Sequence, residues 1–321
     1  MRLPARSIRT PTSVSEAAQR VLGGLLDERG LPRNAAYPLP EPDDRAGWET
    51  LKAAVDAQYR AGAEAMAAHV RATVETLTIG EATVRVAMGE DGDGRRAYID
   101  LHGGALVFGG GTPCRRGAQV QADRLGVCCY AIDYRMPLAH PFPAALDDCL
   151  TVYRHVLARH APGEIVIGGR SAGGNLAGAM LLRARDEGLP MPAGLVLLSP
   201  EIDLTESGDT FGTNHLVDAI LPQSLMNANL LYAGGRDLAD PYLSPLFADL
   251  AGFPPTFLQS GTRDLFLSNT VRMHRALLRA GVAAELHVFE AMPHGGFMGQ
   301  TPEDEELSMA VAEFIAARWP R

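Results

Sequence analysis

Short apolar runs alternate with amphipathic stretches along most of this chain, and this alternation constrains the fold more than any other feature. Each run is followed by a turn rich in Gly or Pro and then by a stretch with helical periodicity. Buried strands that alternate with helices predict an α/β fold, with a mostly parallel sheet covered on both faces. Eight strand segments are expected: 74–79, 82–88, 97–101, 127–132, 164–169, 194–199, 256–260 and 285–290.

Two segments fall outside this alternation. Residues 13–71 have helical periodicity on both sides of a Pro-rich link, and about 56 residues separate the strands expected at 194–199 and 256–260. A plain crossover needs far fewer residues, so we expect a helical insertion there. The expected organisation is an N-terminal helical cap segment (1–70), a first core part (71–204), a cap insertion (205–238) and a second core part (239–321).

Composition excludes one class of function. The 321 residues include 38 Asp and Glu against 29 Lys and Arg, which gives a formal net charge of −9. Nucleic-acid binding depends on a basic face, so we expect no nucleic-acid partner. No stretch reaches the roughly 20 apolar residues that span a bilayer, and the N-terminus lacks the apolar core of a secretory signal. We therefore expect no membrane partner. Four cysteines without a CxxC pair predict free thiols in a cytoplasmic protein.

Ligands of parallel sheets bind beyond the carboxyl ends of the strands, so the residues that follow each strand are the candidate site. After the strand at 164–169 comes a G-x-S-x-G pattern, Gly169 to Gly173, and then a helical stretch. A strand-turn-helix of this kind is too tight for flanking side chains and lifts the serine above the sheet. Ser171 is therefore the candidate nucleophile. The alternative is a tight turn with an ordinary serine.

A second glycine-rich segment, His102-Gly103-Gly104-Ala105, follows the strand at 97–101. Glycine lets the backbone approach a developing negative charge and offer its N–H groups. We expect the N–H groups of Gly103, Gly104 and Ala172 to form an oxyanion hole. His102 is expected to brace this loop and not to act as a base. A flexible glycine loop without chemistry is the alternative.

A histidine and an aspartate follow the last two expected strands. His294 comes after 285–290, where its ring can reach the serine and act as general base. Asp264 comes after 256–260 and can orient the imidazole. The order Ser171, Asp264, His294 is that of α/β-hydrolases. The competing residues lie in expected helices, in the insertion or within a strand: His69, His155, His160, His274, His287, Asp237, Asp240 and Glu290.

Taken together, these motifs resemble the hormone-sensitive-lipase-like branch of the α/β-hydrolases, the bacterial family IV esterases. The resemblance covers most of residues 70–321 and rests on LHGGALVFGG, DYRMPLAHPFPAALDD, GRSAGGNLA, LLSPEIDLTESG, DPYLSPLFADLAGFPPTFLQSGTRD and FEAMPHGGF. It implies an α/β-hydrolase fold with a helical cap, hydrolysis of carboxylic esters and no cofactor, and we expect no metal. It also implies the same nucleophile, base, orienting acid and oxyanion hole.

Four features depart from the family pattern. Ala105 stands where a third glycine is usual, and Asp264 is followed by Leu-Phe in place of Pro-Leu. Arg170 precedes the serine where Asp or Thr is more common. Glu201 stands where the family commonly has an aromatic residue, so a compensating ion pair between Arg170 and Glu201 is our hypothesis.

The expected reaction is the hydrolysis of short- to medium-chain esters by water through an acyl-enzyme intermediate. Apolar residues beyond the strand ends are expected to line an acyl pocket, with ordinary core as the alternative for each: Val107, Phe108, Phe211, Leu216, Ile220, Leu221 and Phe266. The strand at 285–290 is expected near a sheet edge, where a homodimer could form.

Two other functions stay open. A serine peptidase or amidase on the same fold needs a charged subsite for a free amino terminus. Glu16, Glu41 and Glu49 lie in the N-terminal segment, but they form no visible pair. A non-catalytic small-molecule binder would keep the pocket but hold an inert serine.

Overall fold

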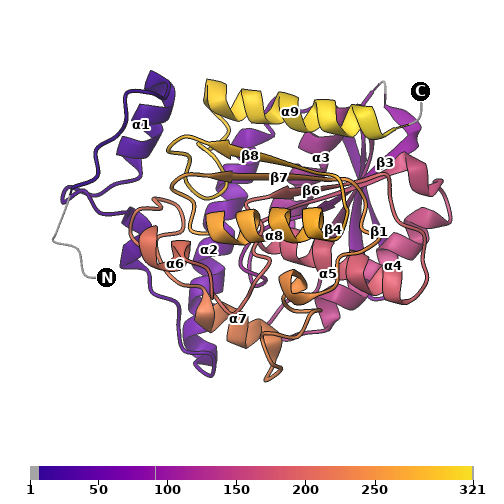
Figure 1. The fold of residues 1–321 in the computed structure, drawn as a ribbon, viewed down its shortest axis with the longest axis horizontal. Helices are drawn as coiled ribbons and strands as arrows, with labels where there is room; N and C mark the ends of the chain where they lie inside the picture. Colours follow the sequence, from indigo (N-terminus) through magenta and orange to yellow (C-terminus); the bar gives the residue numbers. More distant parts are fainter. Residues whose placement is uncertain (1–6, 91, 320–321) are drawn as a thin grey trace.

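An eight-stranded sheet forms the centre of the molecule in the computed structural model, which describes residues 7–90 and 92–319 (Figure 1). Its order is β1-β2-β4-β3-β5-β6-β7-β8. Strand β2 runs antiparallel to β1 and β4, and the other neighbours are parallel. The expected fold class, a mostly parallel sheet of an α/β-hydrolase, is confirmed. The strands are β1 (Thr73–Ile79), β2 (Ala82–Met88), β3 (Asp93–Leu101), β4 (Val127–Asp133), β5 (Ile165–Arg170), β6 (Gly194–Leu198), β7 (Thr256–Gly261) and β8 (Ala284–Phe289).

Burial of the strands follows their place in the sheet. Central strands such as β6 and β7 are buried along their whole length, whereas the edge strands β1 and β8 contain only half-buried and exposed positions. Helices on both faces cause this difference, and it explains why the central strands appear in the sequence as continuous apolar runs. Strand β3 begins at Asp93, four residues before the expected start, because its polar residues 94–96 carry no apolar signal and the pairing register shifts there.

Five helices cover the sheet. The larger buried cluster holds side chains of α4 (Ala144–Leu157), α5 (Ala172–Asp186) and α8 (Leu267–Arg279). A second cluster holds side chains of α3 (Thr112–Leu125) and α9 (Pro302–Arg318). The two clusters correspond to the two faces of the sheet, with α9 and α8 on opposite sides of it in Figure 1. Within the described part of the chain, no helix has both the length and the apolar character that a membrane crossing needs.

The remaining helices come from the N-terminal segment and from the insertion. They are α1 (Glu16–Gly24) and α2 (Arg45–Met66), then α6 (Thr210–Thr213) and α7 (Met226–Ala233). Helix α2 begins after Asp44, which caps it by accepting the N–H of Gly47. A third apolar cluster joins Trp48 of α2 to Ala228 of α7, so the two segments pack over the same part of the core.

Short 3₁₀ turns complete the structure: η1 (Arg33–Ala36), η2 (Pro162–Glu164) and η3 (Pro245–Phe247). All four cysteines are buried and unpaired. Residues 1–6 of the expected cap segment, and with them the start of the N-terminus judged to lack a secretory signal, lie outside the described residues. The same holds for residues 320–321 of the second core part.

Candidate active site

A sharp turn between β5 and α5 carries Ser171. Its backbone is held at φ +55° and ψ −123°, a strained conformation for a residue with a side chain. A Cβ at Gly169 would collide with the Gly173 backbone, and a Cβ at Gly173 would collide with the carbonyl of Leu101. Both flanking positions therefore require glycine, for the steric reason that the sequence pattern indicated.

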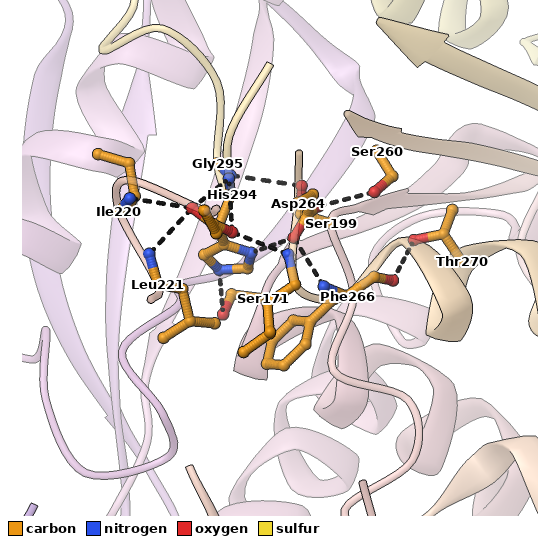
Figure 2. Close-up of polar contacts among 12 residues, drawn as sticks. Ser171, Ser199, Ile220, Leu221, Ser260, Asp264, Phe266, Thr270, His294 and Gly295 are labelled. Carbon is orange, nitrogen blue, oxygen red and sulfur yellow. Dashed lines mark hydrogen bonds and ion pairs between the residues drawn. The ribbon is translucent and has the colours of Figure 1, made fainter. Parts of the chain in front are cut away.

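The hydroxyl of Ser171, the imidazole of His294 and the carboxylate of Asp264 lie in one hydrogen-bonded line (Figure 2). His294 Nε2 is 2.9 Å from Ser171 Oγ, and Nδ1 is 3.0 Å from Asp264 Oδ1. The carboxylate fixes the proton on Nδ1, so Nε2 is free to accept the serine proton. The three residues are separated by up to 123 positions along the chain. They meet because β5, β7 and β8 end at the same edge of the sheet.

Asp264 is fully buried and held by further donors besides His294, Ser199 among them. Ser260 Oγ donates to Oδ2 at 2.7 Å, and the amide of Phe266 donates to Oδ1 at 2.9 Å. Burial alone would raise the pKa of Asp264. The charge of His294 and its hydrogen bond, with the hydrogen bonds from Ser199 and the Phe266 amide, together outweigh burial and keep the pKa of Asp264 below its usual value. The carboxylate is therefore ionised at neutral pH and can stabilise an imidazolium.

We expect ester hydrolysis to fail at acidic pH because His294 must be neutral to accept a proton. Burial would lower the pKa of His294, but the charge and hydrogen bond of Asp264, together with the charge of Asp218, raise that pKa above its ordinary value. As the pH falls through this raised pKa, Nε2 is protonated and kcat/KM declines. The acid limb of a kcat/KM profile should therefore lie above about 6.5, the ordinary value for histidine. An acid limb clearly below that value would contradict this assignment.

The loop after β3 lies against the serine. The Cβ that Gly103 lacks would sit 3.2 Å from Ser171 Cβ, so the Gly103 backbone approaches the nucleophile closely. Gly104 has φ +124°, and a side chain there would collide with the carbonyl of Phe108. Ala105, the departure from the usual glycine, is held in the left-handed region at φ +51°. Ala172, the third expected donor, is the first residue of α5, so its N–H is one of the free amides at a helix start.

Side chains from two directions brace this loop. His102 Nδ1 donates to the carbonyl of Gly103 at 2.8 Å, and the His102 ring stacks on Tyr134. From α2, Lys52 Nζ donates to the carbonyl of Val107 at 2.6 Å, and Asp56 accepts the amide of Gly109. The bracing role expected of His102 agrees with these contacts. Lys52 and Asp56 were not expected; their i,i+4 spacing on a helix is the signal that points to a pair.

Most of the residues expected to line an acyl pocket gather in one apolar cluster. Val107, Phe108 and Phe266 are buried in it, and Phe211 and Leu221 pack against it. The ring of Phe266 lies edge-on to the imidazole of His294, with centroids 4.9 Å apart. The other two residues lie apart from the cluster: Leu216 is 41% exposed and Ile220 is half-buried.

The hypothesis of an ion pair between Arg170 and Glu201 is wrong. The Arg170 guanidinium, at the exposed end of β5, donates instead to the carbonyl of Gly295. Glu201 is 1% exposed, and no Lys or Arg among the described residues pairs with its carboxylate. The two positions follow neighbouring strands, but their side chains reach different environments.

We expect Glu201→Gln to stabilise the protein, and increasingly so as the pH rises. Burial, with the nearby charge of Glu206, raises the pKa of Glu201 to about 8. Below its unfolded pKa of about 4.3 the group is protonated in both states. Between that value and about 8 only the unfolded chain releases the proton, so rising pH favours unfolding. The Glu201→Gln variant does not have this titration, so its free energy of unfolding should exceed that of wild type by on the order of a few kcal/mol near pH 8.

Thermal unfolding at several pH values checks this expectation, because the difference in Tm between Glu201→Gln and wild type should grow from pH 5 to pH 8. Glu305→Gln, at an exposed position on α9, is the matched control and should leave the pH dependence unchanged. A constant Tm difference across this range would contradict the raised pKa.

Two groups of side chains in the described structure are close enough to share a cation. One is Asp218, Asp264 and His294, and the other is His102, Cys114 and Asp133. The first group is already engaged in the hydrogen bonds of the site. In the second, Asp133 is paired with Arg85. Both groups therefore contain side chains that already bind other protein groups.

Comparisons with known proteins agree with this geometry. A profile of the family described as alpha/beta hydrolase fold matches residues 98–298. An acetyl-hydrolase of Streptomyces hygroscopicus is 32% identical over 222 residues, 68% of this chain and 74% of that protein. The carboxylesterase NlhH of Mycobacterium tuberculosis (strain ATCC 25618 / H37Rv) is 34% identical over 218 residues, 63% of this chain and 67% of that protein.

Solved structures extend the similarity to the whole chain. The crystal structure of an esterase E25 superposes with a TM-score of 0.92 at 32% identity and covers 100% of this chain and 99% of that one. An esterase from the bacterial hormone-sensitive lipase family superposes with a TM-score of 0.79 at 30% identity over 95% of this chain and 99% of that one. The chain therefore belongs to the α/β-hydrolase fold family, in its hormone-sensitive-lipase-like branch.

Proposed function

We propose that this protein is a serine carboxylesterase. The observation that carries the proposal is the hydrogen-bonded line from Ser171 Oγ through His294 to Asp264, set at the carboxyl end of a parallel sheet. The relatives described as esterases support the same reaction class. The substrate is a small carboxylic ester, and water is the second substrate.

In the first half-reaction, Ser171 Oγ attacks the ester carbonyl carbon while His294 Nε2 takes its proton. Asp264, 3.0 Å from Nδ1, stabilises the imidazolium that forms. The carbonyl oxygen becomes an oxyanion that the N–H groups of Gly103, Gly104 and Ala172 bind. The tetrahedral intermediate then collapses: the carbon–oxygen bond to the alcohol breaks, and the imidazolium gives its proton to the departing oxygen.

In the second half-reaction, water replaces the alcohol. His294 Nε2 removes a proton from the water as its oxygen attacks the acyl carbonyl, and the same oxyanion hole holds the new tetrahedral intermediate. The bond to Ser171 Oγ breaks, and the imidazolium returns a proton to the serine. The free acid leaves, and the enzyme is back in its starting protonation state.

Short- to medium-chain acyl groups suit the apolar surroundings of the site. Phe266 lies against the imidazole, and Phe211 packs beside Phe266 with ring centroids 5.7 Å apart. Ser171 and His294 are only 8% and 9% exposed. A small acyl chain fits such a covered apolar site more readily than a long one.

A series of para-nitrophenyl esters from acetate to palmitate tests the proposal. Activity should peak among the shorter esters and fall toward palmitate. A peak at palmitate would overturn the esterase assignment in favour of a lipase. Labelling of Ser171 by a fluorophosphonate should succeed; an unreactive serine in a folded sample would indicate a non-catalytic binder.

An aminoacyl anilide, tested beside the esters, separates the peptidase alternative. A subsite for a free amino terminus would need a charged group such as a pair of free glutamates in the N-terminal segment. Glu16 and Glu49 instead pair with Arg20 and Arg45 at exposed positions on α1 and α2. We expect the anilide to be a far poorer substrate than the ester.

A homodimer that pairs along β8 and a cytoplasmic location complete the proposal. Strand β8 is at the edge of the sheet, and the four free thiols suit a reducing compartment. Light scattering tests the dimer, since a monomer mass would remove it.

A further inference from the structure

A buried aspartate of the insertion, Asp218, contacts the two loops that carry the acid and the base. Its side chain is fully buried. Asp218 Oδ2 accepts the amide of Leu265 at 2.8 Å, and the amide of His294 lies 3.1 Å and 3.2 Å from the two oxygens. Leu265 directly follows Asp264 in the chain. One carboxylate therefore binds the backbone of both catalytic loops.

The same carboxylate also organises its own turn. Asp218 Oδ1 accepts the amides of Ile220 and Leu221 at 2.9 Å and 3.0 Å (Figure 2). Leu221 packs against the apolar cluster that holds Phe266, and Phe266 contacts the imidazole. Asp218 thus connects the turn after α6 to the catalytic loops, and the same turn contacts the apolar cluster beside the imidazole.

Asp218 carries a charge whose partners are mainly amides. No Lys or Arg in the described chain forms an ion pair with it, and four backbone N–H groups surround its oxygens. An oxygen of Asp218, an oxygen of Asp264 and a ring nitrogen of His294 all lie within 4.8 Å of one another. A buried charge therefore lies beside the imidazole, although the turn alone would not require one.

We propose that Asp218 is a positioning residue for ester hydrolysis. It holds the Asp264 and His294 loops against the cap insertion, so that Ser171, His294 and Asp264 align only when the insertion packs against the core. This inference rests on the proposed function. Asp218 does not touch the reacting atoms and acts through the backbone of His294 and Leu265. The turn that carries Asp218 also contacts the apolar cluster. Asp218 therefore connects the apolar residues beside the site to the two catalytic loops.

Asp218→Asn is the sharpest test, because it keeps the shape and removes the charge. An amide group can turn only one acceptor toward the four N–H donors, so its NH₂ must face either the catalytic loops or the turn at Ile220 and Leu221. We expect kcat to fall about 100-fold, since a misplacement near 1 Å has an effect of that size. KM should change little, because substrate contacts are retained. Asp218→Ala should lower kcat at least as far.

The pH profile provides a readout that a purely structural role would not move. The charged groups that act on the His294 ring are Asp264, Asp218 and Arg170. The two carboxylates favour the imidazolium, and Arg170 opposes it. Removing the charge of Asp218 should therefore shift the acid limb of kcat/KM to lower pH. The rate of fluorophosphonate labelling at Ser171 should fall together with kcat.

Asp203→Asn is the matched control. Asp203 is also fully buried, just before the insertion, and accepts bonds from Thr205, Ser207 and Arg272 without contacting either catalytic loop. It should lower Tm but leave kcat and the pH profile close to wild type.

The outcomes are separable. If wild type hydrolyses no ester and Ser171 is not labelled, the proposed function fails. If wild type is active and Asp218→Asn shows the kcat and acid limb of Asp203→Asn, the positioning role is overturned. Should Asp218→Ala fail to fold, the asparagine variant decides alone, with its Tm measured beside that of the control.

Discussion

Ser171→Ala is expected to lower kcat/KM for a short para-nitrophenyl ester by about a millionfold, which is the loss typical of removing a serine nucleophile. The variant keeps the imidazole, the carboxylate and the oxyanion loop, but it has no oxygen to form the acyl-enzyme. Alanine adds no bulk at the elbow, where φ is +55°, so the fold should be retained. Steady-state kinetics, with Tm as the check on folding, measures the effect.

Ser308→Ala provides the matched control. Its hydroxyl donates to the carbonyl of Asp304 on α9 and takes no part in the site. This variant should keep wild-type turnover and wild-type labelling by a fluorophosphonate, whereas Ser171→Ala should lose both. Substantial turnover by a folded Ser171→Ala sample would mean that another group attacks the ester.

The elements nearest the chemistry were predictable because local stereochemistry dictates them. The turn at Ser171 admits only glycine at its flanks, and Gly104 must avoid the carbonyl of Phe108. Such constraints act over a few residues and leave a readable pattern. The central strands were predictable for a similar reason, since burial on both faces favours apolar residues at most positions.

Contacts made through the backbone leave no such pattern. Asp218 binds the amides of Leu265 and His294, and every residue except proline offers an amide. Nothing in the residue types along the chain marks these partners, which lie 47 and 76 positions away. The role of Asp218 was therefore not predictable from the sequence, whereas Asp264 was marked by its place after a strand.

Side-chain direction limited the prediction in a different way. Arg170 and Glu201 were expected to pair because both depart from the family pattern and carry opposite charges. The Arg170 side chain leaves the exposed end of β5, while Glu201 is buried behind the nucleophile. Proximity along the sheet edge does not fix which way a side chain points, and only packing decides it.

Asp264→Asn is expected to lower kcat about ten-thousand-fold at neutral pH, because an amide cannot orient and stabilise the imidazolium as a carboxylate does. Asp264 Oδ1 accepts the amide of Phe266 and lies against His294 Nδ1, and Oδ2 accepts Ser260 Oγ. The asparagine has one accepting oxygen for these three donors. Where its NH₂ faces Nδ1, the ring proton moves to Nε2, and Nε2 can no longer take the proton of Ser171. Where its oxygen faces Nδ1, the imidazolium loses the charge that stabilises it.

The pH profile and a control distinguish this mechanism from simple destabilisation. Without the charge of Asp264, the pKa of His294 should fall, so any residual activity should persist to lower pH than in wild type. Asp203→Asn, which removes an equally buried carboxylate away from the imidazole, should lower Tm without this loss of kcat. An Asp264→Asn enzyme within tenfold of wild type, at unchanged Tm, would mean that another group orients the imidazole. Asp218 would be the first to examine, since its oxygen lies within 4.8 Å of the ring nitrogen.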